Sequence, residues 1–161
     1  MKVLWAPWRM EYILSDKEKT GCIFCAGKDG TVDGEGLVLH SGPMSIIMMN
    51  KFPYNNGHLL VAPVRHTPDL NGLSVEENLD LILMVRKALE ILKKEMSPEG
   101  FNVGLNLGKI AGAGVEEHMH FHIVPRWSGD TNFMAVTGDV RVIPEHIQET
   151  YNKLKPYFEK L

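Results

Sequence analysis

Three histidines at alternate positions are the residues of this chain best suited to chemistry. They are His118, His120 and His122, and the residues between them are apolar. In a β-strand successive side chains point to opposite faces, so the imidazoles would share one face at intervals of about 6.6 Å. On a helix, residues two apart point in nearly opposite directions, and the imidazoles would be separated. A metal-binding tract or a solvated face would not need this strict alternation, so the pattern predicts a strand over residues 118–124.

The two cysteines of the chain form a second candidate group. Cys22 and Cys25 lie three positions apart, and such a pair suits a metal site or a redox pair better than an extracellular disulfide. A metal site needs further ligands, and a redox pair lacks the usual thioredoxin-like context here. Two plain buried thiols are the third interpretation, and the spacing by itself leaves all three open.

Composition limits the classes of partner. The chain has 161 residues, 44% of them hydrophobic, which predicts one domain with a core of its own. Its net charge of −3 predicts no broad basic surface for nucleic acid, although a few cations and backbone N–H groups can hold a compact anion. We find neither a signal-peptide core nor an apolar stretch of membrane-spanning length, so we expect a cytoplasmic protein without a membrane partner.

The histidine strand needs neighbouring strands to hold it. Short apolar runs predict strands over 37–40, 44–49, 58–63 and 101–107. The unbroken apolar character of 44–49 indicates burial on both faces, and Pro125 is expected to end the histidine strand.

Two helices are expected beside these strands. Ser74 and Glu77 have the spacing of a capping box, and the helix that follows should stop before Pro98. Its periodic apolar residues predict a buried stripe of Leu79, Ile82, Leu83, Val85, Leu89 and Leu92. A shorter helix with Pro144 near its first turn should run to about residue 158.

The predicted fold class is α+β. Hairpin-length links between strands and one long helix favour an antiparallel meander of about five strands, with a further helix at the C-terminus. The single domain, 1–161, would comprise an N-terminal arm (1–20), a Cys-x-x-Cys knuckle and loop (21–36), the sheet with the long helix (37–127) and a C-terminal extension (128–161).

Residues 118–124 resemble the His-φ-His-φ-His-φ-φ signature of the histidine-triad superfamily of nucleotide hydrolases and transferases, where φ is apolar. The resemblance covers nearly the whole chain. Residues 50–58 and 105–108 are similar to the family's ribose-side and α-phosphate segments, while 4–12 and 125–134 resemble the branch of bacterial diadenosine tetraphosphate phosphorylases and hydrolases. This resemblance implies the antiparallel fold described above.

The resemblance also implies catalytic roles. His120 would attack an α-phosphorus and form a nucleotidyl-histidine, which splits one difficult displacement into two easier ones. His122 would donate a hydrogen bond to a phosphoryl or leaving-group oxygen. His58 is expected to belong to the cluster beneath the site, with a structural role.

Substrate-binding residues follow by motif position. Asn50, beside Lys51, would contact a ribose hydroxyl, and Asn106 would donate to the α-phosphate. Backbone N–H groups of the turn that holds Gly114 and Val115 would stabilise charge on the phosphoryl oxygens.

The loop before the triad departs from the family pattern. Many members carry Gly-Gln-Ser/Thr-Val there, whereas this chain has Gly-Ala-Gly-Val-Glu-Glu over 112–117. Backbone N–H groups would therefore have to make more of the phosphate contacts from this loop. Lys109 and Arg126 are candidate partners for the distal phosphates.

Zinc-containing relatives suggest a ligand set of Cys22, Cys25, His66 and His118. Two thiolates and two imidazoles make a closed, structural zinc site. The resemblance further implies a homodimer, and it allows a divalent cation that accompanies a polyphosphate substrate.

The leading hypothesis is an enzyme that cleaves a dinucleoside polyphosphate, most plausibly diadenosine tetraphosphate, at an α-phosphate through His120. A purine nucleoside phosphoramidase with the same nucleophile is the alternative within enzymes. A nucleotide-binding signalling module with negligible turnover would not need a free nucleophile, and a purely structural zinc protein would leave the other histidines unexplained.

Overall fold

The computed structural model describes residues 21–28, 37–130 and 143–161. The predicted N-terminal arm lies outside these ranges, as do the loop over 29–36 and residues 131–142. The strands are β1 (Val38–Ser41), β2 (Ser45–Met49), β3 (Leu59–Pro63), β4 (Gly100–Leu105) and β5 (Phe121–Arg126). The helices are α2 (Ile23–Lys28), α3 (Val75–Met96) and α5 (Ile147–Phe158), with 3-10 turns η1 (Leu70–Gly72) and η2 (Lys109–Ala111). None of the described helices is long and apolar enough to cross a membrane.

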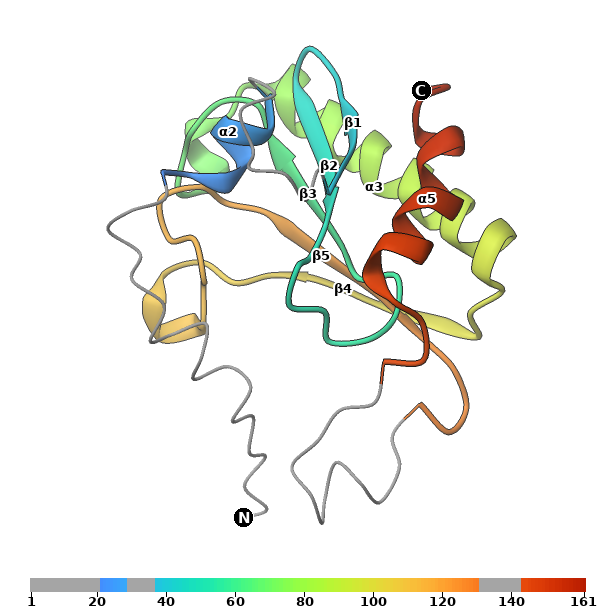
Figure 1. Cartoon of the computed structure of the whole chain (residues 1–161). Helices are drawn as coiled ribbons and strands as arrows, with labels where there is room; N and C mark the ends of the chain where they lie inside the picture. Colours follow the sequence, from blue (N-terminus) through green and yellow to red (C-terminus); the bar gives the residue numbers. More distant parts are fainter. Residues whose placement is uncertain (1–20, 29–36, 131–142) are drawn as a thin grey trace.

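The described strands form one five-stranded sheet with the order β1-β2-β3-β5-β4. Every neighbouring pair is antiparallel, which confirms the predicted α+β class with its long helix and C-terminal helix. The strand order adds a detail to the predicted meander: β5 lies between β3 and β4, so β3 and β4 run in the same direction and α3 crosses between them (Figure 1). Strand β5, which holds His122, therefore has a paired neighbour on each side.

The two faces of the sheet carry different layers. Odd-numbered residues of β2 and β3, such as Ile47 and Val61, pack with α3 and α5 in the main core. Even-numbered residues, such as Met48 and Leu60, pack on the opposite face with Phe24 of α2. All residues of β2 are buried, which confirms the predicted burial on both faces for residues 45–49, whereas Met44, the first residue of the predicted strand, precedes β2 and is exposed. In Figure 1, α5 lies beside α3, with which it is in contact.

Helix α3 begins as predicted but buries a different stripe. Its capping box joins Ser74 and Glu77, and the helix ends at Met96, ahead of Pro98. The buried residues are Leu81, Val85, Ala88 and Leu92. Three residues of the predicted stripe are exposed instead: Leu79, Ile82 and Leu83. The helix is apolar over more than one face, and only packing against the sheet decides which stripe is buried.

Strand β5 is displaced from its predicted range of 118–124. Pairing with β3 reaches only from Ile123 to Phe121, because the N–H of Met119 donates instead to the carbonyl of Thr67 at 2.8 Å. His118 and His120 therefore precede the strand. Pro125, expected to end it, lies within it and pairs with Phe101 of β4. Since β3 pairing stops at Ile123, the missing N–H of Pro125 leaves no β3 partner unsatisfied.

The remaining boundaries differ by small amounts. Strand β4 ends at Leu105, two residues before its predicted end. Helix α5 starts after His146, whose side chain accepts the N–H of Gln148 as an N-cap, so Pro144 precedes the helix. The Lys155 ammonium of α5 donates to the carbonyls of Val38 and Leu39 at 3.1 and 3.0 Å and so covers the β1 edge.

The first turn of α3 gives a pH-dependent prediction for stability. The Arg65 guanidinium and the Ser74 N–H hold the pKa of Glu77 at about 2, below its ordinary value of 4.5. Because the pKa of Glu77 is lower in the folded state, its ionised carboxylate stabilises the protein at pH values above 4.5. This stabilisation is lost as the pH falls from 4.5 toward 2. We expect Glu77→Gln to lower Tm at about pH 6, and the difference from the wild type to shrink below pH 4.5 and to vanish only as the pH approaches 2.

Thermal melts across this range check the prediction. Glu90→Gln is the matched control, because Glu90 is an exposed carboxylate farther along the same helix that forms an ion pair with Lys87 at 3.5 Å. If the difference in Tm between Glu77→Gln and the wild type stayed constant with pH, the depressed pKa of Glu77 would be contradicted.

Candidate functional site

His120 lies directly before β5 and is 5% exposed. Its Nδ1 is 2.9 Å from the carbonyl oxygen of His118. A carbonyl only accepts, so Nδ1 carries the proton and Nε2 carries the lone pair of the neutral ring. Burial lowers the pKa of His120 below its ordinary value, while the hydrogen bond to His118 opposes this shift. The arrangement favours a neutral imidazole with a nucleophilic Nε2.

A chain of hydrogen bonds orients His122. The Tyr54 N–H donates to Nδ1 of the buried His58 at 3.0 Å, so the proton of a neutral His58 is on Nε2. That Nε2 lies 3.0 Å from Nδ1 of His122, which therefore accepts and leaves the His122 proton on Nε2. The rings of His120 and His122 are 4.8 Å apart. One face of the site thus holds a nucleophilic nitrogen beside a hydrogen-bond donor.

Cys22, Cys25, His66 and His118 meet next to this pair. One ligand atom from each lies within 4.8 Å of the others. Nδ1 of His118 is 3.1 Å from the Cys22 sulfur and 3.2 Å from Nδ1 of His66, and the Cys25 sulfur is 3.4 Å from Nδ1 of His66. Ligand arms of 2.0–2.3 Å in a tetrahedron place ligand atoms roughly 3.3–3.8 Å apart. The cluster therefore has the donor set and the size of a tetrahedral zinc site.

Nε2 of His118 has a hydrogen-bond acceptor, and Nε2 of His66 faces a carboxylate beyond hydrogen-bond distance. Nε2 of His118 donates to the carbonyl of Pro63 at 2.7 Å, and Nε2 of His66 lies 3.8 Å from the Glu117 carboxylate. Metal-binding histidines commonly use such partners to fix their orientation. Each histidine thus turns Nδ1 toward the cluster.

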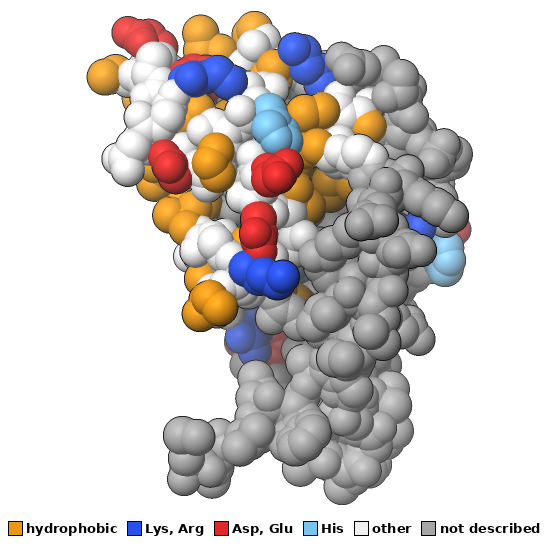
Figure 2. Space-filling view, turned by 90° about the vertical axis from the view of Figure 1, so that its left-hand side faces the viewer, with side chains coloured by type: hydrophobic (Ala, Val, Ile, Leu, Met, Phe, Trp, Pro, Cys, Tyr) orange, Lys and Arg blue, Asp and Glu red, His pale blue; other side chains and the backbone are white. Residues whose placement is uncertain are grey.

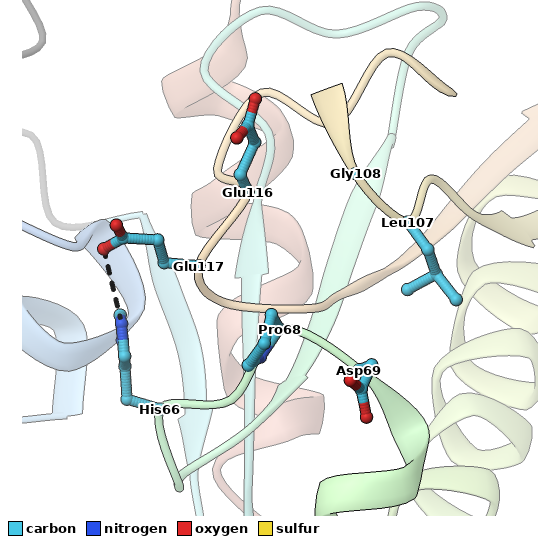
Figure 3. A pocket seen from close by; sticks show the side chains of 7 residues that line it. All are labelled: His66, Pro68, Asp69, Leu107, Gly108, Glu116 and Glu117. Atoms are coloured by element: carbon cyan, nitrogen blue, oxygen red, sulfur yellow. Dashed lines mark ion pairs between the residues drawn. The ribbon is translucent and has the colours of Figure 1, made fainter. Parts of the chain in front are cut away.

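A hollow of about 590 Å³ opens beside His66. Figure 3 shows His66 and Glu117 directed toward each other at one side of it, with the 107–108 segment opposite. Asp69, Glu116 and Glu117 contribute carboxylates to its lining. Because these side chains repel phosphate, the hollow does not suit a polyphosphate.

Phe24 connects the cysteine pair with His120. It lies between Cys22 and Cys25, is 1% exposed, and its ring centroid is 5.0 Å from those of both His118 and His120. It also packs in the cluster of Ile46, Met48, Leu60 and Ala62. Phe24 is not among the site residues predicted from the sequence, although its place inside Cys-x-x-Cys was a signal.

The two predicted ribose-side residues lie in different surroundings. Asn50 follows β2, and its side-chain nitrogen lies 3.2 Å from Nδ1 of His58, which joins it to the histidine chain. Lys51 is exposed and borders a separate hollow of about 240 Å³ that also includes His146 and the start of α5.

The predicted phosphate-side residues lie near the triad. Asn106 follows Leu105, which pairs with Phe121, so the register brings Asn106 to the level of His120. Gly114 is half-buried, and Val115 packs on the cluster that includes Phe24.

Arg126 has a structural partner instead of a substrate-facing position. Its guanidinium forms a bidentate pair with Asp130 at 2.6 and 2.9 Å and donates to Asn102 at 2.8 Å. The hypothesis that Arg126 holds distal phosphates is therefore not supported, because both edges of the group are occupied.

Comparison with known proteins agrees with this geometry. Residues 35–129 match the HIT domain family. The chain is 39% identical to an AP-4-A phosphorylase of Mycobacterium tuberculosis over 154 residues, which cover 91% of this chain and 79% of that protein. It is 30% identical to an adenosine 5'-monophosphoramidase of Schizosaccharomyces pombe, over 83% of this chain and 98% of that protein.

Among solved structures, a zinc-bound histidine triad family protein from Mycobacterium smegmatis superposes with a TM-score of 0.69 at 25% identity. The match covers 87% of this chain and 94% of the other. From the row of histidines, the shared sheet and these matches, it follows that the chain belongs to the HIT, or histidine triad, family.

Proposed function

We propose that this protein is an enzyme that cleaves dinucleoside polyphosphates, with diadenosine tetraphosphate as the leading substrate, at an α-phosphate. The observation that carries the proposal is the orientation of His120, whose Nδ1 is held by the His118 carbonyl so that Nε2 is available for attack. The 39% identity to an AP-4-A phosphorylase supports the substrate class.

In this mechanism Nε2 of His120 forms a bond to the α-phosphorus as the bridging P–O bond breaks. The departing nucleotide takes the electron pair of that bond. The enzyme is left with a nucleotidyl-histidine, which water or inorganic phosphate then resolves. Because Nδ1 keeps its proton, the substituted imidazole is a cation whose N–H still donates to the His118 carbonyl.

His122 would assist the leaving group. Its Nε2 proton, fixed in place by the bond from His58 to Nδ1, suits donation to a phosphoryl or bridging oxygen. His58 has a positioning role in this scheme, in keeping with the structural role expected from the sequence.

Charge on the phosphoryl oxygens needs further donors. Asn106 and the backbone N–H groups around Gly114 and Val115 are proposed for the α-phosphate, since they come from segments that flank His120. Asn50 and Lys51 are proposed for the ribose side. A divalent cation that accompanies the polyphosphate would neutralise part of its remaining charge.

We infer a structural zinc ion at Cys22, Cys25, His66 and His118. Four of the separations among the ligand atoms are 3.1–3.7 Å and all are within 4.8 Å, which supports the inference, and so does the zinc-bound relative. Four protein ligands complete a tetrahedron, so the ion has no open position for substrate and serves to join α2 to the segment before β5. Thiols kept as metal ligands suit a reducing compartment, in agreement with the predicted cytoplasmic location.

We further propose a homodimer. Helix α3 exposes Val75, Leu79, Ile82 and Leu83, at 79%, 59%, 48% and 40%, and their spacing makes them one stripe. Strand β4 pairs only with β5 among the described strands, and its Val103 is 43% exposed. A second copy would cover both features. The face shown in Figure 2 carries charges of both signs among hydrophobic side chains, so this face is not the broad basic surface that nucleic acid needs.

A phosphoramidase is the second candidate, because the match to the S. pombe adenosine 5'-monophosphoramidase covers almost all of that protein. The same His120 attack would break a P–N bond in place of a P–O bond. Parallel assays with adenosine 5'-phosphoramidate and diadenosine tetraphosphate distinguish the two candidates by relative kcat/KM.

Product analysis with diadenosine tetraphosphate tests the main proposal. AMP and ATP formed without phosphate would identify a hydrolase, and ADP and ATP formed only with phosphate would identify a phosphorylase. We expect His120→Ala to lower kcat more than roughly 10³-fold and His122→Ala roughly 10²- to 10⁴-fold. His40→Ala, a change outside the site on β1, should leave kcat unchanged. An active His120→Ala variant would refute the mechanism.

Metal analysis tests the zinc site. We expect about one zinc ion per chain in protein purified without chelators, and a clear loss in His66→Ala, because His66 supplies one of the four ligand atoms. His146→Ala is the control, since His146 caps α5 away from the cluster. Equal zinc content in the two variants would rule out His66 as a ligand.

Sedimentation velocity tests the dimer. Leu79→Glu places a charge in the exposed apolar stripe, and we expect it to yield monomers at concentrations where the wild type is dimeric. Lys87→Glu changes an exposed charge on the same helix and should leave the dimer intact. If both variants sediment as the wild type does, the stripe is not the interface.

A further inference from the structure

Phe24 contacts the proposed nucleophile directly although it belongs to the cysteine segment. Its ring centroid lies 5.0 Å from that of His120, at an interplanar angle of 37°. The His122 ring is 4.8 Å from His120 at an angle of 57°. The imidazole of His120 therefore has an aromatic ring of α2 and an imidazole of β5 as neighbours.

These neighbours restrict a motion that the hydrogen bond leaves open. The bond from Nδ1 to the His118 carbonyl fixes one atom of the ring, but the imidazole can still swing about that contact. A displacement of about 1 Å at an attacking atom is enough to lower a rate by roughly 10²-fold. The packing of Phe24 limits this swing and so controls where Nε2 points.

The position of Phe24 excludes a direct role in substrate binding. The side chain is 1% exposed, so its face is not available to a nucleobase. It is enclosed by the His118 ring at 5.0 Å and by apolar residues of β2 and β3. Its effect on the reaction has to pass through the histidines.

The chemistry of the intermediate adds a second effect. The imidazole becomes a cation once Nε2 bears the nucleotidyl group, and an aromatic face within about 6 Å of a cation stabilises it. Since the neutral ring lacks that charge, this stabilisation grows along the reaction and acts on kcat more than on KM.

We propose that Phe24 is a positioning residue for His120, which holds the imidazole ring in the orientation that directs Nε2 at the α-phosphorus. The inference rests on the proposed function of His120 as nucleophile. It also gives the cysteine pair a catalytic consequence, because Cys22 and Cys25 flank Phe24 and fix α2 against the site.

The test replaces the ring by an aliphatic side chain, Phe24→Leu, in the full chain. We expect kcat for diadenosine tetraphosphate to fall roughly 3- to 30-fold, the range of a lost cation–π contact, with KM changed less than about twofold and zinc content unchanged. Phe24→Met is the second variant, in case the leucine protein is unstable.

Phe158→Leu is the matched control. Phe158 is equally buried but lies on α5 in the main core, so the variant carries a similar packing loss on the other face of the sheet. A kcat decrease in Phe24→Leu no larger than that in Phe158→Leu, or an increase in KM alone, would overturn the proposal.

A spectroscopic measurement separates this inference from the proposed activity. NMR relaxation of the His120 ring carbons reports how far the imidazole swings on the ps–ns timescale. We expect a rigid His120 ring in the wild type and in Phe158→Leu, and a clearly lower order parameter for this ring in Phe24→Leu. A wild type that cleaves neither substrate refutes the proposed function, whereas an unchanged order parameter of the His120 ring in Phe24→Leu refutes the role of Phe24.

Discussion

His118 connects the two halves of the site. Its backbone carbonyl accepts the Nδ1 proton of His120, its Nε2 donates to Pro63, and its Nδ1 meets the cysteines. The residue is fully buried, so each polar atom needs a partner. These contacts tie the end of β3, the cysteine segment and the nucleophile to one point, and a shift at any of them would be transmitted to the others.

The sheet makes this arrangement possible by separating its two faces. Main-core residues such as Met119 and Ile123 point toward α3 and α5, and the histidines between and beside them point to the side of α2. Without the long helix on one face, the apolar residues of this segment would have nothing to pack against. The alternation of apolar residues and histidines would then not fix which face of the sheet the histidines occupy. Stability and chemistry are thus divided between the two sides of a central strand.

Histidine protonation in this site follows from backbone groups. The N–H of Tyr54 and the carbonyl of His118 each leave only one choice of tautomer for the ring they contact. The result is two neighbouring imidazoles with opposite roles, His120 with a lone pair on Nε2 and His122 with a proton there. Residues of one type thus acquire different chemistry from their partners.

By itself, the sequence predicted the approximate position of each sheet strand and of the two long helices, and it singled out the histidines that we propose to be reactive. Two of these predictions rest on local patterns. The alternation around His120 predicted that the three histidines share one face, and the capping box at Ser74 predicted the start of the long helix. The tertiary structure alone decided which stripe of α3 is buried, that β5 begins only at Phe121, and that Phe24 contacts His120. These features depend on contacts between residues far apart in the chain, so no local sequence pattern can predict them.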